Sequence, residues 1–525
     1  MPHRIDDRSL GHLLVDRAAR SGDRRFLRFE GRELTFAEVE RASARVANRL
    51  SEMGVAPGDR VALMLPNGLE YPVCWLGVVR LGAIVVPVNT GYRDADLSHV
   101  LRDSEAGTVI TLNEFVPLVD RVSETIPTID RVLAWDGMSS VRGGNPEARL
   151  PFADQLERVA DRHELSGLGP TTVSVLQYTS GTTGFPKGVM IPHGGWLQVA
   201  RTYVAAGAFT EADVVAIMTA FYYGDFGWNL ILCLLAGMEL VLLPRFSAST
   251  LWRSLAETGA TFFYCLGTMP VLLLKQPEDP AGDRGHRVRW VSCSGIPADR
   301  HAEIERRWGV PWREAYGTTE IGFVTMTALD EDHLTGSGSI GRLAGGFEGR
   351  VIRADGTEAA PGEIGEFICR GPALSLGYWN KPEATARWMQ DGWAHTGDLM
   401  RRDEAGCFYL VGRTKDMIRR GGENIAAQEV EAVLAEHPGV AGAACVAVPD
   451  DIRGEEVLAF VLPAGTAPEA EEVLAHCRGR LAPFKVPRYL RFVEAFPLTP
   501  SQRVEKHKLP RELAGCYDAA AAAWR

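Results

Sequence analysis

A twelve-residue run from Tyr178 to Val189 constrains this chain more than any other segment. It reads Tyr-Thr-Ser-Gly-Thr-Thr-Gly-Phe-Pro-Lys-Gly-Val and so combines four hydroxyl-bearing Thr and Ser side chains with three glycines and one lysine. Glycine lets the backbone approach an anion closely, and consecutive N–H groups form a concave nest for phosphate oxygens. The hydroxyls add donors, and Lys187 adds a mobile positive charge. Because the apolar segment 173–176 precedes it, the run predicts a strand that leads into a phosphate-binding loop.

This run is not a Walker A loop. That motif places its lysine between glycine and serine or threonine, whereas Lys187 follows Pro186 and precedes Gly188. A surface turn rich in threonine and glycine is the alternative interpretation. The glycines, hydroxyls and lysine together favour binding of a triphosphate.

Length and charge limit the protein classes to consider. A chain of 525 residues exceeds what one hydrophobic core usually supports, so we expect two or more domains. The formal net charge of −11 argues against nucleic acid as a principal partner, because no basic excess is available to neutralise phosphates. ATP needs only a local positive patch, so this charge does not exclude it.

Cysteine spacing and apolar patterning indicate a cytoplasmic location. The nine cysteines are scattered without a CxxC pair or a zinc-ligand spacing, which predicts reduced, mostly buried thiols. The N-terminus is polar, so no secretory signal is expected. Arg80 and Glu239 interrupt two of the apolar stretches, so no membrane span is expected.

Periodicity predicts an α/β fold. Thr35-Phe-Ala-Glu38 is a capping box that opens a helix over 36–53, and a buried strand follows at 61–65. Helices and strands continue to alternate through 238–243 and 260–266, which predicts stacked, mostly parallel sheets with covering helices. Short strands and Gly/Pro turns then indicate a small β-rich subdomain from about residue 335. The predicted elements of the C-terminal part are helices near 427–436 and 470–481 and strands near 442–448, 456–462 and 488–493, followed by an alanine run at 519–523 that we expect to fray.

These elements predict a large N-terminal domain and a small α+β C-terminal domain. The large domain spans 1–412, with the β-rich subdomain at about 335–412. A hinge is expected at 413–416, and a small mobile domain that acts as a lid at 417–525. The sequence contains neither an internal repeat nor a downstream carrier module.

The glycine-rich run resembles the signature loop of the adenylate-forming superfamily. That superfamily includes acyl- and aryl-CoA synthetases, adenylation domains of peptide synthetases, and luciferases. Five further motifs follow in the order that the superfamily shows, namely Tyr316-Gly-Thr-Thr-Glu320, Gly377-Tyr-Trp-Asn380, His395-Thr-Gly-Asp-Leu399, Gly412-Arg-Thr-Lys-Asp-Met-Ile418 and Gly421-Gly-Glu-Asn-Ile425. The resemblance therefore covers nearly the whole chain.

The resemblance implies roles for individual residues. Tyr316 would stack on adenine, Glu320 would bind Mg²⁺, and Lys415 would be the hinge residue. Asp398 and Arg413 would contact the ribose. The residues that it assigns to ATP are Thr179, Ser180, Gly181, Thr182, Thr183, Gly184, Lys187, Ser294, Gly295, Ile296, Tyr316, Gly317, Thr318, Thr319, Asp398 and Arg413.

The implied reaction has two steps and requires ATP and Mg²⁺. An acid attacks the α-phosphate, which releases pyrophosphate and leaves an acyl-adenylate; CoA is the expected co-substrate of the second step. Charge builds up on the phosphoryl oxygens, so cations must be aimed there. Lys187, Glu320 and a cation from the small domain are the expected catalytic groups, and the small domain would turn about the hinge between the steps.

Two segments depart from the superfamily pattern. The late motif Thr-x-x-Gly-Lys reads Thr499-Pro-Ser-Gln-Arg503 here, so Arg503 stands at the position of the catalytic lysine. Carnitine-type CoA ligases have a similar ending. We interpret Arg503 as a functional substitute, with Lys506 as the alternative.

The second departure concerns the substrate gate. The family histidine corresponds to Tyr223, and the position that carries aspartate in amino-acid-activating relatives is Gly224. An α-amino acid is therefore a poor candidate, although Asp225 lies next to that position. Tyr222, Tyr223, Gly224, Asp225 and Gly317 are the predicted gate and pocket residues. The aromatic cluster around them (Phe221, Tyr222, Tyr223, Phe226 and Trp228) is typical of core packing more often than of a pocket. If it lines the substrate tunnel, it favours an aryl or short hydrophobic acid over a long chain.

Three functions are consistent with this sequence. The first is a stand-alone acyl- or aryl-CoA ligase of secondary metabolism that acts as a monomer or homodimer. The second is an adenylating enzyme that passes the adenylate to an amine or carrier protein, or that activates a non-carboxylate acid such as nitrite for aryl diazotisation. The third is a catalytically impaired nucleotide-binding regulatory protein.

Overall fold

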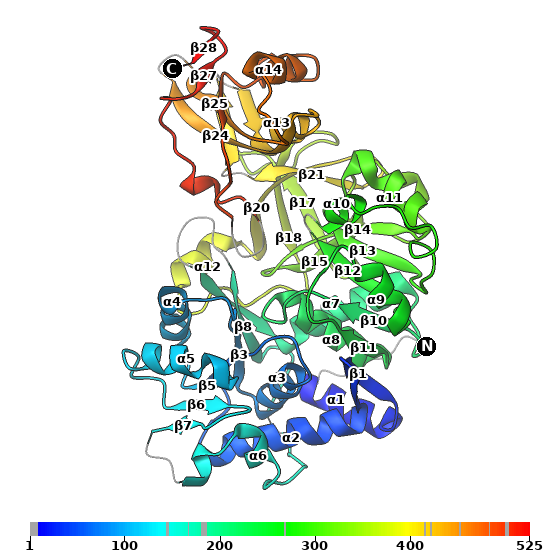
Figure 1. The fold of residues 1–525 in the computed structure, drawn as a ribbon, viewed down its shortest axis with the longest axis vertical. Coiled ribbons are helices and arrows are strands. Elements are labelled where there is room, and N and C mark those ends of the chain that lie inside the picture. Colours follow the sequence, from blue (N-terminus) through cyan, green and yellow to red (C-terminus); the bar gives the residue numbers. More distant parts are fainter. Residues whose placement is uncertain are drawn as a thin grey trace. The chain divides into compact units, whose positions relative to one another are not determined.

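The computed structural model describes residues 9–524 except 143–145, 166, 180–185, 267–268, 414–415, 421–422, 451–452, 482 and 499–502. It divides into two compact units (Figure 1). The first contains the described residues of 9–348 together with 370–394, and the second contains 349–369 together with 395–524. The large N-terminal and small C-terminal parts confirm the predicted fold class, whereas the boundaries proposed for the domains and hinge stay predictions.

The larger sheet of the first unit is mixed, and its central strands are parallel. Among the described residues its order is β16-β15-β14-β13-β12-β10-β11-β1-β2. Strands β1 and β10–β14 form parallel pairs, and β2, β15 and β16 add antiparallel edges. The strands are β1 Arg25–Phe29, β2 Arg32–Thr35, β10 Val214–Ile217, β11 Glu239–Leu242, β12 Phe262–Leu266, β13 Trp290–Ser294, β14 Trp312–Thr318, β15 Gly322–Met326 and β16 Arg342–Leu343.

The second sheet of this unit contains the strands that flank the glycine-rich run. Its order is β7-β6-β5-β3-β4-β8-β9, with parallel pairing from β6 through β8 and an antiparallel β8–β9 hairpin. The strands are β3 Arg60–Met64, β4 Ile84–Pro87, β5 Thr108–Thr111, β6 Arg131–Ala134, β7 Ser140–Val141, β8 Val173–Thr179 and β9 Lys187–Pro192. The stacked, mostly parallel sheets are therefore confirmed.

Helices cover both sheets, and α3, α7 and α8 lie between them (Figure 1). Nearly all residues of α3 are buried, as expected for a helix that is apolar on every side. A Cβ at Gly77 would lie 2.5 Å from Val46, so glycine allows α3 to pack closely on α2. The helices are α1 Leu10–Ser21, α2 Phe36–Glu52, α3 Glu70–Leu81, α4 Asp94–Ser104, α5 Val116–Ser123, α6 Phe152–Leu156, α7 His193–Gly207, α8 Gly224–Ala236, α9 Leu251–Thr258, α10 Met269–Leu274, α11 His301–Trp308 and α12 Pro382–Trp388.

The β-rich segment forms a five-stranded sheet in the order β17-β18-β20-β19, with β21 paired to β20. Its strands are β17 Glu348–Ile352, β18 Gly365–Arg370, β19 Met389–Gln390, β20 Trp393–Arg402 and β21 Phe408–Arg413. The hairpin β20–β21 places Asp398 directly opposite Arg413.

The C-terminal part is an α+β layer, as predicted. Its sheet has the order β23-β22-β25-β26-β27-β28, with β24 paired to β25. Ala523 pairs with Asp518 in the last hairpin, so the alanine run does not simply fray as expected. The elements are β22 Met417–Arg420, β23 Glu423–Ala426, α13 Ala427–Ala435, β24 Val440–Asp450, β25 Gly454–Pro463, α14 Ala470–Arg478, β26 Tyr489–Phe492, β27 Tyr517–Asp518 and β28 Ala523–Trp524.

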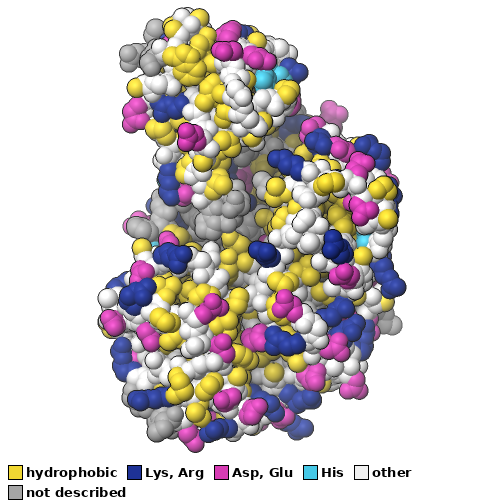
Figure 2. Space-filling model, in the orientation of Figure 1, with side chains coloured by type: hydrophobic (Ala, Val, Ile, Leu, Met, Phe, Trp, Pro, Cys, Tyr) yellow, Lys and Arg dark blue, Asp and Glu magenta, His cyan; other side chains and the backbone are white. Residues whose placement is uncertain are grey.

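Other sequence expectations can be checked directly. Thr35 and Glu38 form the predicted capping box at the start of α2. All nine cysteines are free and buried. No helix within the described ranges is long and apolar enough to cross a membrane. Acidic and basic side chains alternate over the face shown in Figure 2, which has no continuous basic patch.

Candidate active site

The predicted phosphate-binding loop joins β8 to β9. Thr179, the last residue of β8, pairs with Lys187, the first residue of β9. The two stems of the loop are therefore fixed by a strand ladder. The predicted ATP ligands Ser180, Gly181, Thr182, Thr183 and Gly184 lie outside the described residues, as does the predicted hinge residue Lys415.

A single tyrosine connects two of the predicted catalytic residues. The ammonium of Lys187 lies 5.3 Å from the centroid of the Tyr378 ring, a cation–π contact. The Tyr378 hydroxyl donates a hydrogen bond of 3.0 Å to Oε1 of Glu320. All three side chains are partly buried. The structure thus brings Lys187 and Glu320 together, and it adds Tyr378, to which sequence reasoning gave no role although it lies in a recognised motif.

Backbone hydrogen bonds hold this tyrosine in place. The amide of Met190 donates to the carbonyl of Gly377 (2.9 Å), and Trp379 donates to Gly188 (2.8 Å). The amide of Ser375 donates to the carbonyl of Glu320 at 2.7 Å. The motif at 377–380 therefore pairs with β9 through an isolated antiparallel bridge between Val189 and Tyr378, which explains its position in the site.

A buried carboxylate supports the segment predicted to line the adenine. Glu314 accepts hydrogen bonds from the amides of Gly295 (3.1 Å) and Ile296. Gly295 has a φ of 101°, which glycine adopts without strain. Burial raises the pKa of Glu314 from 4.5 to about 7, and the two N–H donors oppose that rise. Sequence reasoning missed Glu314, although its charge two residues before Tyr316 of the recognised motif was an available signal.

The hairpin β14–β15 carries the motif that ends at Glu320. Tyr316 is 8% exposed and lies opposite Thr325. A Cβ at Gly317 would lie 2.1 Å from the carbonyl oxygen of Gly322, so this position requires glycine. Thr318 ends β14, and Thr319 lies in the turn that follows.

The predicted gate is anchored to the same sheet as the loop. The Gln177 amide donates to the carbonyl of Tyr222 at 2.8 Å. The rings of Tyr222 and Tyr223 lie 4.8 Å apart, and Asp225 is in the first turn of α8. A Cβ at Gly224 would meet no atom within 4 Å, so a larger residue would fit there.

The aromatic residues around the gate separate into two groups. Phe221 and Phe226 are buried against Tyr71, so they belong to the core. Trp228 contacts Tyr264 at 5.3 Å and Phe323 at 5.4 Å, both edge to face. The Tyr264 hydroxyl donates to Ser294 at 2.8 Å. Trp228, Tyr264 and Phe323 are buried as well. Through Ser294, the last residue of β13, this second group reaches the carboxyl end of that strand, where open α/β sheets bind ligands. 

The second unit positions another pair of predicted ATP ligands. Nε of Arg413 lies 2.7 Å from Oδ1 of Asp398 in an ion pair, and Asp398 is buried. The Asp398 amide donates to the Thr396 hydroxyl, which donates to the carbonyl of Phe367. These contacts fix the direction of the Asp398 carboxylate.

The two candidate C-terminal cations have different surroundings. Nζ of Lys506 lies 2.7 Å from Oε1 of Glu431 and 3.7 Å from Oδ2 of Asp416. Burial raises the pKa of Glu431, and the Lys506 ammonium opposes this rise. Arg503 is exposed and directly precedes Val504, which pairs with Leu498 in an isolated bridge. Two carboxylates therefore hold Lys506, and Arg503 lies at the surface.

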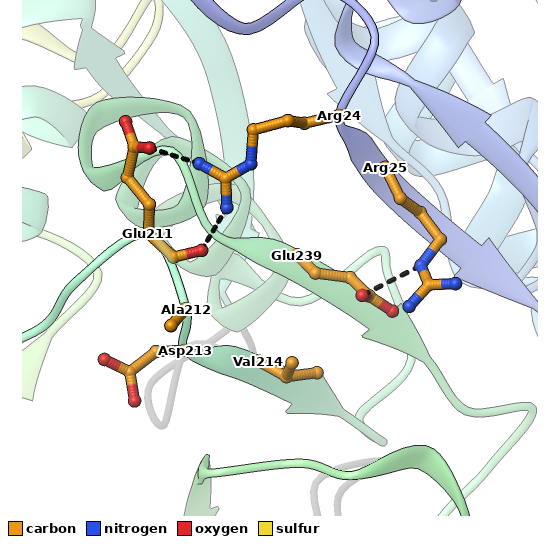
Figure 3. A pocket seen from close by; sticks show the side chains of 7 residues that line it. All are labelled: Arg24, Arg25, Glu211, Ala212, Asp213, Val214 and Glu239. Carbon is orange, nitrogen blue, oxygen red and sulfur yellow. Dashed lines mark hydrogen bonds and ion pairs between the residues drawn. The ribbon is translucent and has the colours of Figure 1, made fainter.

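The first unit has a depression of about 340 Å³ on the large sheet (Figure 3), at the ends of its strands opposite to the carboxyl ends described above. Val214 and Glu239 begin β10 and β11, so this depression is at the amino ends of parallel strands. Its arginines are paired: Arg24 donates to Glu211, and Arg25 lies 2.9 Å from Glu239. The paired charges and the location do not favour a ligand site.

The comparisons with known proteins agree with this arrangement. The family described as AMP-binding enzyme matches residues 14–379, and the AMP-binding enzyme C-terminal domain matches 429–503. A long-chain-fatty-acid–CoA ligase of Bacillus subtilis is 32% identical, over 98% of this chain and 96% of the relative. ATP-bound MatB from Rhodopseudomonas palustris is similar at a TM-score of 0.85 with 28% identity, covering 95% of this chain and 97% of that chain. The anthranilate CoA ligase AuaEII in complex with anthranoyl-AMP is similar at a TM-score of 0.86 with 26% identity, covering 96% of this chain and 97% of that chain.

The fold and the motif geometry define an adenylate-forming enzyme. The chain belongs to the AMP-binding enzyme family. It is an ATP-dependent, AMP-forming ligase that adenylates an acid and transfers it to an acceptor.

Proposed function

We propose that the chain is an acyl- or aryl-CoA ligase whose ATP site is built around Lys187, Tyr378 and Glu320. The observation that carries the proposal is that one tyrosine contacts both the lysine and the carboxylate beside the β8–β9 loop. CoA is proposed as acceptor because relatives that align over nearly the whole chain are named CoA ligases.

In the first half-reaction, a carboxylate oxygen of the acid attacks the α-phosphorus of ATP. The bond from that phosphorus to the bridging oxygen breaks, and pyrophosphate leaves. Lys187 and the backbone of the loop stabilise the charge on the leaving group, because positioned donors are most effective where charge develops. Ser294, Gly295 and Ile296 line the adenine, and Tyr316 stacks on it.

Mg²⁺ fits the chemistry of this site. It prefers oxygen ligands and usually takes one or two carboxylates, with substrate phosphates and water completing its shell. Glu320 would supply the carboxylate, which Tyr378 orients through its hydrogen bond. When bound, the ion neutralises charge on the phosphates.

For the second unit, we propose that Asp398 and Arg413 bind the ribose hydroxyls. Arg503 supplies positive charge to the α-phosphate during adenylation. In the second half-reaction the CoA thiol loses its proton and attacks the acyl carbon, and AMP leaves as the carbon–oxygen bond to its phosphate breaks.

A compact acid, aryl or short, is the proposed substrate class. Trp228, Tyr264 and Phe323 pack edge to face at the strand ends next to Ser294 and Gly317. Flat aromatic faces suit an aryl ring better than a flexible alkyl chain. An α-amino acid is disfavoured because Gly224 offers no carboxylate for its amine.

The experiment is ATP–pyrophosphate exchange with fatty, aryl, amino and inorganic acids including nitrite, with CoA consumption measured in parallel. We expect exchange with an aryl or short acid, formation of AMP and pyrophosphate, and equimolar loss of free CoA thiol. Exchange without loss of CoA thiol would show that the acceptor is an amine or a carrier protein and not CoA. ADP and orthophosphate as the sole products would overturn the adenylation chemistry.

A further inference from the structure

Helix α4 contacts the stem that leads into the loop. The Tyr178 hydroxyl donates a hydrogen bond of 2.9 Å to Oδ2 of Asp103. Burial and the Asp103 charge raise the pKa of the Tyr178 phenol, so it stays protonated and remains a donor. Only Thr179 separates Tyr178 from residue 180, where the undescribed loop residues begin, so this contact fixes the end of β8.

The same carboxylate also holds the segment that carries Tyr378. Nζ of Lys381 donates to Oδ1 of Asp103 at 2.6 Å. The Asp103 side chain is about one-tenth exposed, whereas Lys381 is 41% exposed. Asp103 therefore joins β8 to the 377–381 segment through its two oxygens.

The same helix contacts the stem that leaves the loop. Nε2 of His99 lies 2.8 Å from the carbonyl oxygen of Pro186, close enough for an N–H donor. The His99 ring also lies perpendicular to the Tyr178 ring, at a centroid distance of 6.4 Å. Pro186 directly precedes Lys187, so this contact acts on the residue next to the proposed catalytic cation.

These contacts come from one face of one helix. His99 and Asp103 are four residues apart, so they lie one turn apart on the same side of α4. The β8–β9 ladder fixes the spacing of the stems, and α4 fixes their position relative to the rest of the second sheet. A loop whose ligands are mainly backbone N–H groups depends on such support, because its groups must be held close to the productive geometry.

We infer that α4 is the positioning element for the triphosphate loop, with Asp103 and His99 as positioning residues for adenylation. This inference rests on the proposed role of the loop in binding ATP. Neither residue touches the nucleotide in this scheme. They act through Tyr178 and Lys381 and through the carbonyl of Pro186.

The test uses the full chain with four variants: Asp103→Asn, Tyr178→Phe, His99→Ala and the double variant Asp103→Asn/Tyr178→Phe. Asp96→Asn is the matched control, because Asp96 is exposed on the same helix. The measurements are KM for ATP and kcat in pyrophosphate exchange, transfer from supplied acyl-adenylate to CoA, and the melting temperature.

We expect each single variant to raise KM for ATP about ten-fold or to lower the exchange rate about ten-fold. This is the effect of losing one hydrogen bond to a charged or positioning group. Transfer from supplied acyl-adenylate should stay within two-fold of wild type, because that step does not use the triphosphate loop. The double variant should lose no more exchange activity than the stronger single variant, because both changes act on the same contact between Tyr178 and Asp103. Asp96→Asn should match wild type.

Exchange within two-fold of wild type in both Asp103→Asn and Tyr178→Phe would overturn the inference. Equal losses in exchange and transfer, with a lowered melting temperature, would also overturn it, because they indicate general destabilisation. If wild type itself binds no ATP, the proposed function fails and the inference falls with it. Binding by wild type with unchanged variants refutes the inference alone.

Discussion

Replacing Glu314 by glutamine tests the least expected feature of the site. Glu314 is buried, and its two oxygens accept the amides of Gly295 and Ile296. Burial raises its pKa from 4.5 to about 7. Glutamine keeps the shape of the side chain but does not titrate, and it offers one acceptor oxygen in place of two.

The shift predicts a specific pH dependence of stability. Between pH 4.5 and about 7 the folded protein keeps a proton on Glu314 that the unfolded chain has released. This contribution to stability is therefore complete below 4.5 and is lost as pH rises through 7. At about 1.36 kcal/mol per pKa unit the whole change is about 3 kcal/mol, and roughly three quarters of it falls between pH 5 and pH 8.

The assay is denaturant unfolding of wild type and Glu314→Gln at pH 5, 6.5 and 8, followed by tryptophan fluorescence. The difference in unfolding free energy should move by about 2 kcal/mol or more in favour of the variant between pH 5 and pH 8. Glu257→Gln is the control, because Glu257 is exposed on α9. A difference that is constant across this range would show that Glu314 does not titrate there, and the reasoning from burial would be refuted.

Three further predictions concern catalysis and stability. Lys187→Ala and Glu320→Ala should each lower adenylation by about 10²–10³-fold while circular dichroism stays native, and a variant within three-fold of wild type would remove that residue from the leaving-group site. Arg503→Ala should block adenylate formation but spare transfer from supplied acyl-adenylate, with Arg503→Lys retaining substantial activity. Lys506→Ala should instead destabilise the small domain by about 3 kcal/mol, because the mostly buried Glu431 carboxylate loses its cation and keeps the Cys445 amide as a donor. The reverse pattern would make Lys506 the catalytic cation. The last prediction concerns His193, because burial lowers its pKa from 6.5 to about 4. The free energy of unfolding of wild type should fall by about 2 kcal/mol between pH 7 and pH 5, since the unfolded chain takes up the proton in this range. His193→Asn should lack this fall in parallel melting experiments.

Local patterns were sufficient to predict the secondary structure around the site. The capping box at Thr35 predicted the start of α2, and the alternation of helices and strands predicted the stacked sheets. The helix predicted at 427–436 is α13, Ala427–Ala435. These features depend on neighbours within a few residues, so the sequence contains them directly. The alanine run failed as a predictor because pairing of Ala523 with Asp518 outweighs the local tendency to fray.

The supporting contacts of the site could not be predicted in this way. Tyr178 and Asp103 are 75 residues apart, and Tyr378 and Glu320 are 58 apart. Such pairs depend on sheet order and on which helix covers which strand, and neither is written in a local motif. The motifs identified which residues carry the chemistry, whereas the structure identified what holds them.

The residues missed by the sequence share one physical task. Glycine-rich segments bring backbone N–H groups close to an anion, but glycine supplies no side chain to hold the segment and loses the most conformational freedom on folding. The order must therefore come from other elements. Glu314 supplies it to the segment at 294–296, and Asp103 and His99 supply it to the stems of the loop at 180–185. In both places a polar side chain from a neighbouring element contacts a segment that the motifs assign to the nucleotide. Substitutions at these supports should thus change ATP affinity without removing any proposed ligand, and that distinguishes support from direct contact.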